Sequence, residues 1–372
     1  MTRGKFTFTI GTQFVLDDTT PELNQQFVTL YNHFFTGKDF DEGQFKIRVK
    51  DYFNINKGNF EAHDAFFNNF TILTNNCLLP EGKLGEIEKI WSSALQIAYE
   101  WEKENAGERV HKGSPYHFLG ITYLLFGDLA KGFLHIHQAL EEDKKTQNKD
   151  CPHTPGYYFV TLNYDQSVYG QDLLKIIAAF VEEKLTQYRQ DRNGSLAIAE
   201  FKRKFLEKET MVDTIFSFVY SIFNLYKLEK GVNKEFVQSD FASLLETNLI
   251  FDLCLVIDLI IKTADSKQYF AEHFDYMASQ SLLTVNTAKA REANDKFKAD
   301  FGRTLVELLS GTFTFADNSK PTPLETDLLV VYGFRNYSAH SIESQKVIYE
   351  KFLEIIQRVL NALFFVIEKL LQ

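Results

Sequence analysis

Apolar side chains recur every three or four positions along most of the chain, which is the spacing of amphipathic and buried α-helices. Residues 83–105, 170–190 and 209–230 carry this pattern, and a further buried helix is predicted from about Phe241 to Thr263. The first fifteen residues instead alternate apolar and polar side chains, which favours a short β-hairpin. The pattern therefore predicts an all-α protein with, at most, one hairpin at its amino end.

The region from residue 236 to 372 is predicted to form a bundle of four or five helices. After the buried helix, further helices are expected near 267–282 and 285–310. Thr322 and Glu325 have the spacing of a helix capping box, and Pro323 occupies the first helical position, where its missing N–H costs nothing. The next helix should therefore begin at Pro323.

The end of that helix and the start of the last one enclose the stretch VYGFRNYSAHS, residues 331–341. Gly333 is expected to weaken or end the first helix just before Arg335. The last helix is expected to begin just after His340, with Ser341 as its N-cap. Its continuous apolar stripe is formed by Ile348, Phe352, Ile355, Ile356, Val359, Leu363, Val366, Ile367 and Leu370.

A segment of about 30 residues in the front half, PYHFLGITYLLFGDLAKGFLHIHQAL, alternates small and large side chains. This pattern is typical of two antiparallel helices joined by a tight turn, here at Gly127 and Asp128. It resembles one tetratricopeptide repeat, and an ordinary helical hairpin within a larger bundle is the alternative. The positions concerned are Tyr116, Leu119, Gly120, Tyr123, Gly127, Gly132, Ile136 and Ala139.

The length of 372 residues exceeds what one hydrophobic core usually serves, so two domains or one long helical array are expected. Only 19 Gly and 7 Pro are present, too few for a sandwich or barrel rich in turns. The Gly-containing polar stretch 229–240 is the best candidate boundary. We therefore predict a helical, tetratricopeptide-like sensor or regulatory region at 1–235 and a separate helical domain at 236–372.

The formal net charge of -10 argues against a surface that binds nucleic acid indiscriminately, because such binding depends on Lys and Arg neutralising phosphates. A nucleic-acid function would need a local basic site. The longest apolar run, Leu249 to Ile261, is too short to span a bilayer and contains two aspartates, so no membrane role is expected. The amino terminus lacks the small-residue cleavage site of a signal peptide, which indicates a cytoplasmic protein.

Several kinds of chemistry lack their sequence motifs. Cys77, Cys151 and Cys254 are odd in number and far apart, which suits reduced thiols. The stretches CPH at 151–153 and HIH at 135–137 lack a partner pair at a metal-ligand spacing. No phosphate-binding glycine loop, GxSxG or HExxH motif occurs. No cofactor and no metal are therefore expected.

Arg335 and His340 are separated by four residues, with Asn336 directly after the arginine, between two apolar helices near the end of a helical domain. This arrangement resembles the R-x4-6-H signature of the HEPN superfamily over roughly residues 236–372. The resemblance implies a metal-independent endoribonuclease on a helical bundle, usually a dimer and often serving phage defence, abortive infection or a toxin system.

Elementary chemistry agrees with these residue types. RNA carries its own nucleophile, the 2'-hydroxyl, so cleavage needs proton transfer and charge stabilisation but no metal. His340 can accept or donate a proton near neutral pH, Arg335 offers a planar fork that matches two phosphate oxygens, and Asn336 can donate to phosphate or orient the imidazole.

One copy of the motif supplies too few groups, because this route usually needs one proton acceptor and one proton donor. On an ideal helix, five positions correspond to about 140° of rotation, so Arg335 and His340 would share a face only through a bend or the reach of the arginine. We therefore predict a homodimer through the C-terminal domain, with RNA bound at a composite site. Acidic residues of the buried helix are candidates for pairing with the arginine or orienting the histidine, and also for caps or surface groups: Glu246, Asp252 and Asp258.

Two alternatives remain open. Arg335 could cap the carboxyl end of its helix and His340 could be a polar group at the start of the next one. The chain would then be a non-catalytic helical adaptor that binds a protein partner or nucleic acid. In the ribonuclease interpretation, the front half would sense a protein or nucleic-acid trigger.

Overall fold

The computed structural model describes residues 20–147, 154–167, 170–231, 240–337 and 345–371. Every regular element in these ranges is helical, which confirms the all-α prediction. The hairpin expected in the first fifteen residues lies outside the described residues. The described chain forms two compact units, one from the residues up to Tyr157 with Ser167 and Gly170, the other from the remainder.

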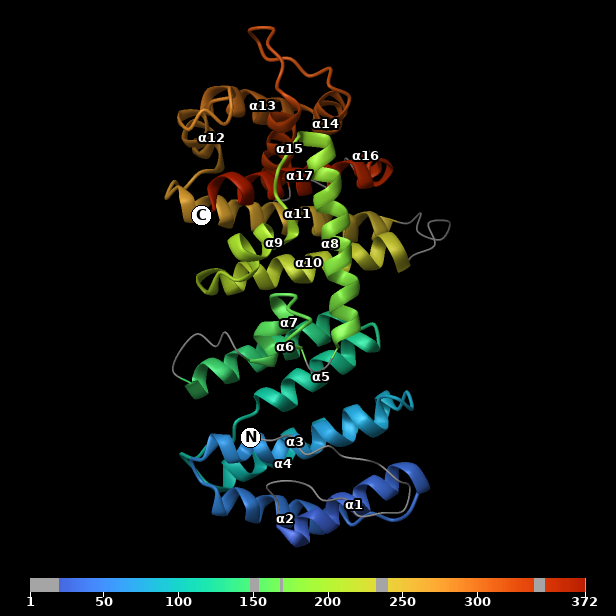
Figure 1. The fold of residues 1–372 in the computed structure, drawn as a ribbon. Coiled ribbons are helices and arrows are strands. Elements are labelled where there is room, and N and C mark those ends of the chain that lie inside the picture. The colour runs from blue at the N-terminus through green and yellow to red at the C-terminus, as the bar shows by residue number, and fades with distance from the viewer. Residues whose placement is uncertain (1–19, 148–153, 168–169, 232–239, 338–344, 372) are drawn as a thin grey trace. The chain divides into compact units, whose positions relative to one another are not determined.

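The first unit is built from successive helix pairs (Figure 1). Contacts within pairs join α1 to α2 and α5 to α6, and contacts between pairs join α2 to α4, α3 to α5 and α4 to α5. Its helices are α1 (Pro21–Thr36), α2 (Glu42–Ile55), α3 (Phe60–Leu73), α4 (Leu84–Glu104), α5 (Gly113–Leu125) and α6 (Leu129–Gln147), with a π-helical turn at Thr74–Leu78. The short α7 (Pro155–Val160) contains the sequence boundary between the two units, after Tyr157.

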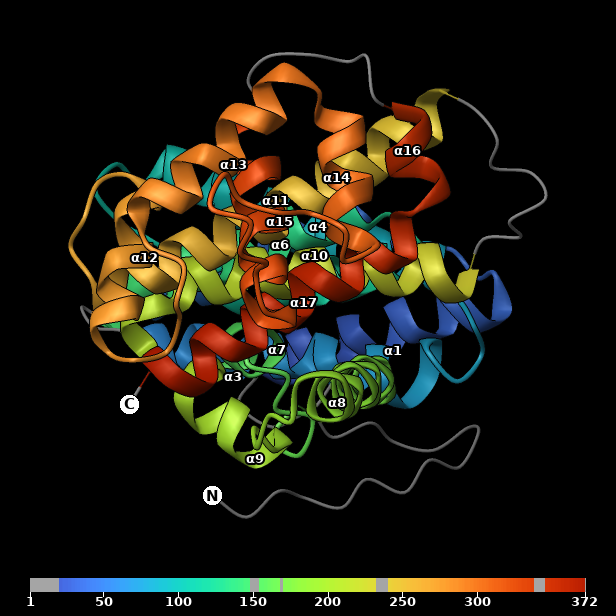
Figure 2. The same cartoon turned by 90° about the horizontal axis from the view of Figure 1, so that it is seen from above.

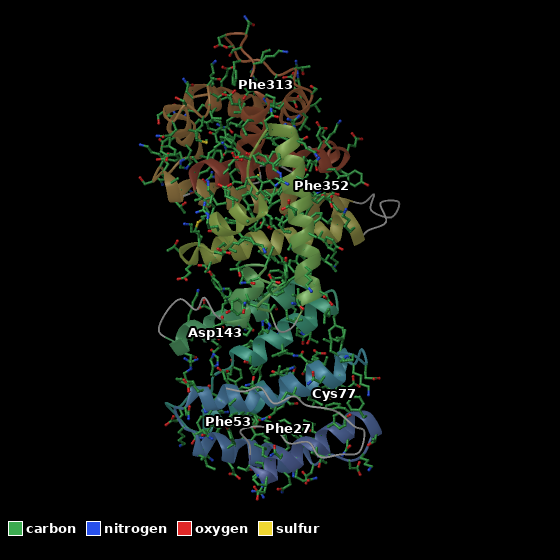
Figure 3. The ribbon with its side chains drawn as sticks, in the orientation of Figure 1. Phe27, Phe53, Cys77, Asp143, Phe313 and Phe352 are labelled. Atoms are coloured by element: carbon green, nitrogen blue, oxygen red, sulfur yellow. The ribbon has the colours of Figure 1, made fainter. Side chains whose placement is uncertain are left out.

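Aromatic rings fill the space between these layers. Phe27 of α1 and Phe53 of α2 point into the core of the first unit (Figure 3) and are almost completely buried. Trp91 of α4 stacks on Phe118 of α5, with ring centroids 4.6 Å apart and planes 4° from parallel. Buried Phe side chains also fill the core of the second unit, so core packing accounts for much of the abundance of Phe in the sequence.

The helical hairpin predicted at residues 115–140 is present as α5 and α6. The chain turns between them at Gly127, whose φ of +84° favours glycine. A Cβ at Gly120 would lie 2.9 Å from the carbonyl oxygen of Gly132, and one at Gly132 would lie 3.0 Å from that of Gly120. These two glycines allow the close helix approach expected from the sequence.

The second unit contains a layer formed by α10, α11 and α17, which α8 crosses steeply (Figures 1 and 2). Helix α11 packs against α10, α15, α16 and α17. The main helices of this unit are α8 (Gln171–Arg192), α9 (Ile198–Phe201), α10 (Val212–Gly231), α11 (Asp240–Ala264), α12 (Phe270–Ser279), α13 (Thr287–Ala299), α14 (Phe301–Leu309), α15 (Pro323–Tyr337), α16 (Gln345–Glu350) and α17 (Phe352–Leu370), with one-turn helices at Lys202–Leu206 and Glu209–Met211.

Two details of this unit differ from the sequence prediction. The helix expected over 285–310 is two helices, because Asp300 has extended backbone and caps α14 by accepting a hydrogen bond from the backbone N–H of Arg303. The final apolar segment is divided at Lys351, and residues 359–368 of α17 are buried on every side rather than along one stripe. The predicted boundary near 235 falls between α10 and α11, and these two helices pack together within one compact unit. The division of the chain into a regulatory and a catalytic region at this boundary stays a prediction.

Candidate active site

The start of α15 has the capping box that the sequence predicted. The backbone N–H of Thr322 donates to Glu325 Oε2 at 2.8 Å, and that of Glu325 donates to Thr322 Oγ1 at 3.3 Å. The second oxygen, Glu325 Oε1, accepts from Thr284 Oγ1 and from the backbone N–H of Val285, both at 2.8 Å. The same carboxylate therefore caps α15 and ties it to the segment before α13.

The end of α15 differs from the prediction at Gly333. The helix does not end before Arg335 but continues to Tyr337. A Cβ at Gly333 would lie 2.5 Å from the ring of Phe297 in α13, so the glycine permits close packing of two helices rather than helix termination. Arg335 and Asn336 consequently lie in the last turn of α15.

Arg335 is anchored by a buried carboxylate. Its Nε donates to Asp258 Oδ2 of α11 at 2.8 Å, and Asp258 is only 3% exposed. The arginine side chain keeps 26% exposure, and its guanidinium carbon lies 5.9 Å from the ring centroid of Phe270. Within the described part of the chain, the hydrogen bonds of this guanidinium are confined to Nε. Nη1 and Nη2 thus donate to no acceptor among the described residues.

Of the three acidic residues singled out on the buried helix, Asp258 pairs with the arginine. The same oxygen, Oδ2, also accepts from Lys262 Nζ at 2.9 Å, one helical turn further on. Glu246 is buried, and Asp252 is half-buried with a pKa that burial raises above its usual range. Two cations thus share one carboxylate oxygen.

Asn336 takes part in a contact between helices. Its Nδ2 donates to Asn294 Oδ1 of α13 at 2.8 Å. This bond links the last turn of α15 to α13, on which Phe297 also packs against Gly333. The role expected for Asn336, donating to phosphate or orienting the imidazole, stays a prediction.

His340 lies outside the described residues, as does Ser341, the expected cap of the last helix. The structure therefore describes two of the three candidate residues, Arg335 and Asn336, and its contacts bring Arg335 together with Asp258. The convergence of Arg335 with His340 stays a prediction.

Sequence reasoning missed a second histidine near Arg335. His273 of α12 is fully buried, its Nδ1 lies 3.0 Å from Asp265 Oδ2, and its Nε2 lies 3.9 Å from Asp258 Oδ1. The sequence did carry a signal, because His273 falls on the same helical face as the apolar residues Phe270, Phe274 and Met277. All four side chains are buried. A histidine on such an apolar face is expected to be buried.

The neighbouring thiol is not a prepared nucleophile. Cys254 is completely buried, and burial raises the pKa of its thiol far above the usual range, which keeps it protonated. Among the residues that the structure describes, no three His, Cys, Asp or Glu side chains are placed to hold a metal ion. The chemistry of the described site is thus that of a guanidinium, two carboxylates, an ammonium and an imidazole.

Comparison with known proteins gives no relative: no family model, no curated protein and no solved structure matches the chain. In the described ranges, none of the helices combines the length and the apolarity needed to cross a bilayer.

Proposed function

We propose that the chain is a metal-independent endoribonuclease in which Arg335 binds the scissile phosphate and His340 transfers protons. The observation that carries this proposal is the anchoring of Arg335 through Nε on the buried Asp258. An arginine held in this way uses only Nε for the structural ion pair, so Nη1 and Nη2 can donate to an oxyanion. The R-x4-H spacing to His340 supplies the second group.

The reaction needs only these groups and the substrate. A base takes the proton of the 2'-hydroxyl, the 2'-oxygen bonds to phosphorus, and the bond from phosphorus to the 5'-oxygen breaks. An acid protonates the departing 5'-oxygen, which leaves a 2',3'-cyclic phosphate and a 5'-hydroxyl. General acid–base catalysis of this kind contributes roughly 10²- to 10⁴-fold, and the guanidinium stabilises the charge that develops on the phosphorane.

A homodimer through the C-terminal region would supply both proton-transfer groups. Two copies related by a twofold axis bring two arginines and two histidines to one cleft, so one imidazole can act as base and the other as acid. The resemblance of the motif implies a role in phage defence, abortive infection or toxicity, with the front half sensing a protein or nucleic-acid trigger.

The test is chelator-resistant cleavage of labelled single-stranded RNA by the full-length protein. We expect cutting in EDTA that Arg335→Ala and His340→Ala each reduce by about 10²-fold or more. Arg303→Ala is the matched control, because Arg303 is a highly exposed arginine of α14 that pairs with Glu307 one turn away. Cleavage that survives both site substitutions, or that depends on added metal, would contradict the proposal.

The dimer is tested separately by adding an excess of His340→Ala to the wild-type protein. Mixed dimers keep only one histidine per composite cleft, where the mechanism needs one as base and the other as acid, so cleavage is expected to fall below the level set by the wild-type concentration alone. Full activity of a protein that sediments as a monomer at assay concentration would exclude the composite site.

The second candidate function is a non-catalytic adaptor, and the stacked helix pairs of the first unit favour it. Aromatic contacts continue from α1 through α5, as in helical repeats that present an extended surface to a partner. The RNA assay separates the two functions, because a non-catalytic adaptor does not cleave RNA. Its binding to a partner should also be unchanged by Arg335→Ala and His340→Ala.

A further inference from the structure

Beside the Arg335 anchor, two buried polar atoms face each other without a hydrogen-bond partner among the described residues. They are Nε2 of His273 and Oδ1 of Asp258, which lie 3.9 Å apart. The histidine is 0% exposed and the aspartate 3% exposed, so bulk water does not satisfy either atom. The opposite ring nitrogen, Nδ1, already meets Asp265 Oδ2 at 3.0 Å.

An unsatisfied buried polar group costs about 1–3 kcal/mol, so a contact that satisfies two of them is favoured. A hydrogen bond needs a separation of about 2.7–3.2 Å, so an approach of roughly 1 Å closes it. A doubly protonated ring donates from both nitrogens, to Asp265 through Nδ1 and to Asp258 through Nε2. Both carboxylates then accept, and neither buried atom is left unpaired.

The first unit contains the completed form of this arrangement. His111, which is almost fully buried, lies 2.7 Å from Asp64 Oδ1 through Nδ1 and 3.0 Å from Asp143 Oδ1 through Nε2. A histidine that bridges two carboxylates is thus a device this chain already uses. His273 has the same two types of partner, with one of the two contacts still open.

The consequence for Arg335 follows from how Asp258 is held. Arg335 Nε and Lys262 Nζ both donate to Oδ2, so the described hydrogen bonds of this carboxylate fall on one oxygen. Rotation about the last bond of an aspartate is broad, so a carboxylate held by one oxygen leaves its partner's orientation loosely defined. A donor on Oδ1 fixes the carboxylate plane and, with it, the direction of the guanidinium.

We propose that His273 is a positioning residue for Arg335, bridging Asp265 and Asp258 so that the Asp258 carboxylate is held by both oxygens. Its consequence for RNA rests on the proposed function, because Arg335 is the phosphate-binding group there. The contact itself concerns only described residues, so it can be tested without substrate.

Two amide substitutions separate positioning from packing. In His273→Asn the amide lies near the place of Nδ1, which preserves the existing contact with Asp265 and removes the group that faces Asp258. In His273→Gln the amide reaches the place of Nε2, which preserves a donor for Asp258 and loses the Asp265 contact. A positioning role and a purely structural role therefore rank the two variants in opposite order.

The experiment follows the Nε–H signal of Arg335 by nitrogen-15 NMR in the full-length protein, with the signal assigned through its loss in Arg335→Lys. We expect His273→Asn to speed the solvent exchange of this Nε–H by about tenfold and His273→Gln by less than about twofold. Thermal unfolding should rank the variants the other way, with His273→Asn more stable because it keeps the Asp265 contact. Wild-type exchange in His273→Asn, or exchange that follows the stability ranking, would overturn the proposal.

RNA cleavage by the same variants tests the consequence for the proposed function. If Arg335 binds phosphate, kcat/KM falls about tenfold in His273→Asn and is largely restored in His273→Gln. If Arg335→Ala cleaves RNA as the wild type does, the proposed function is wrong. The NMR ranking still decides whether His273 positions Arg335.

Discussion

Two buried histidines of the first unit, His111 and His117, differ in charge at neutral pH. Burial alone lowers the pKa of an imidazole, and it lowers that of His117 to about 4. His111 experiences the same burial, but hydrogen bonds and charge from Asp143 and Asp64 outweigh it and raise the pKa to about 9. At neutral pH His117 is therefore neutral, and His111 is a cation between two carboxylates.

The raised pKa of His111 makes the stability of the first unit depend on pH. Because the folded-state pKa lies above the unfolded value of about 6.5, the stabilisation is complete below pH 6.5 and is lost as pH rises through about 9. We expect wild type to lose about 3 kcal/mol more than His111→Gln between pH 6.5 and 9.5. Urea unfolding followed by tryptophan fluorescence measures this unit, since both tryptophans, Trp91 and Trp101, lie in α4.

His117→Gln is the control for that experiment. The pKa of His117 in the folded protein lies below the window, at about 4, so its folded-state charge does not change between pH 6.5 and 9.5. Titration of the same residue in the unfolded chain changes the stability by only about 0.4 kcal/mol over this window, so the variant should keep nearly the wild-type slope of stability against pH. Equal slopes for wild type and His111→Gln would show that the ion pairs of His111 do not stabilise the fold.

At the level of helices, the sequence predicted a boundary correctly where both partners of the signal are local, and failed where the cause is a contact with another helix. The capping box at Thr322 and Glu325 placed the start of α15 correctly, because both partners lie within one turn. The expectation that Gly333 weakens or ends the helix missed the reason for the glycine, which is its contact with the ring of Phe297, distant in the sequence. His273 was missed for the same reason, since Asp258 lies on another helix.

The close contact at Gly333 predicts an unusual sign for a glycine substitution. Gly→Ala within a helix normally stabilises by about 0.5–1 kcal/mol, because alanine has the higher helix propensity. At Gly333 the new methyl would overlap the Phe297 ring, so Gly333→Ala should destabilise the second unit by about 1–3 kcal/mol. Tryptophan fluorescence does not report on the second unit, because both tryptophans lie in the first. The unfolding transition is therefore followed by the loss of helical circular dichroism.

Gly85→Ala is the matched control. Gly85 lies in the first turn of α4, and a Cβ there would meet no atom within 4 Å. This variant should be at least as stable as wild type. A Gly333→Ala protein that is also stabilised would show that α13 and α15 separate easily, and that the Asn336–Asn294 bond tolerates such movement.

At the level of the molecule, the all-α class followed from helical periodicity, but the extent of the C-terminal unit did not. The polar stretch at 229–240 suggested a boundary because composition changes there. The contacts that extend the unit to earlier residues join positions more than 130 apart, such as Arg192 with Asp327 and Tyr188 with Glu368. No local pattern in the sequence encodes those pairs.

These contacts predict that residues 236–372 do not fold alone, whereas 158–372 does. Asp327 is 0% exposed and accepts from Arg192 as well as Arg358, so removing α8 leaves a buried carboxylate with one cation instead of two. Glu368 would also lose the hydroxyl of Tyr188 and the backbone N–H groups of Ser195 and Leu196.

The rings of Tyr188 and Phe201, which pack on Phe364, would be removed from the most buried part of α17. Thermal unfolding by circular dichroism should therefore show one cooperative transition for 158–372 and none for 236–372. A cooperative transition of equal midpoint in the shorter fragment would mean that the buried ion pairs of α8 are dispensable. In that case residue 235 would be the true boundary of the domain that carries Arg335.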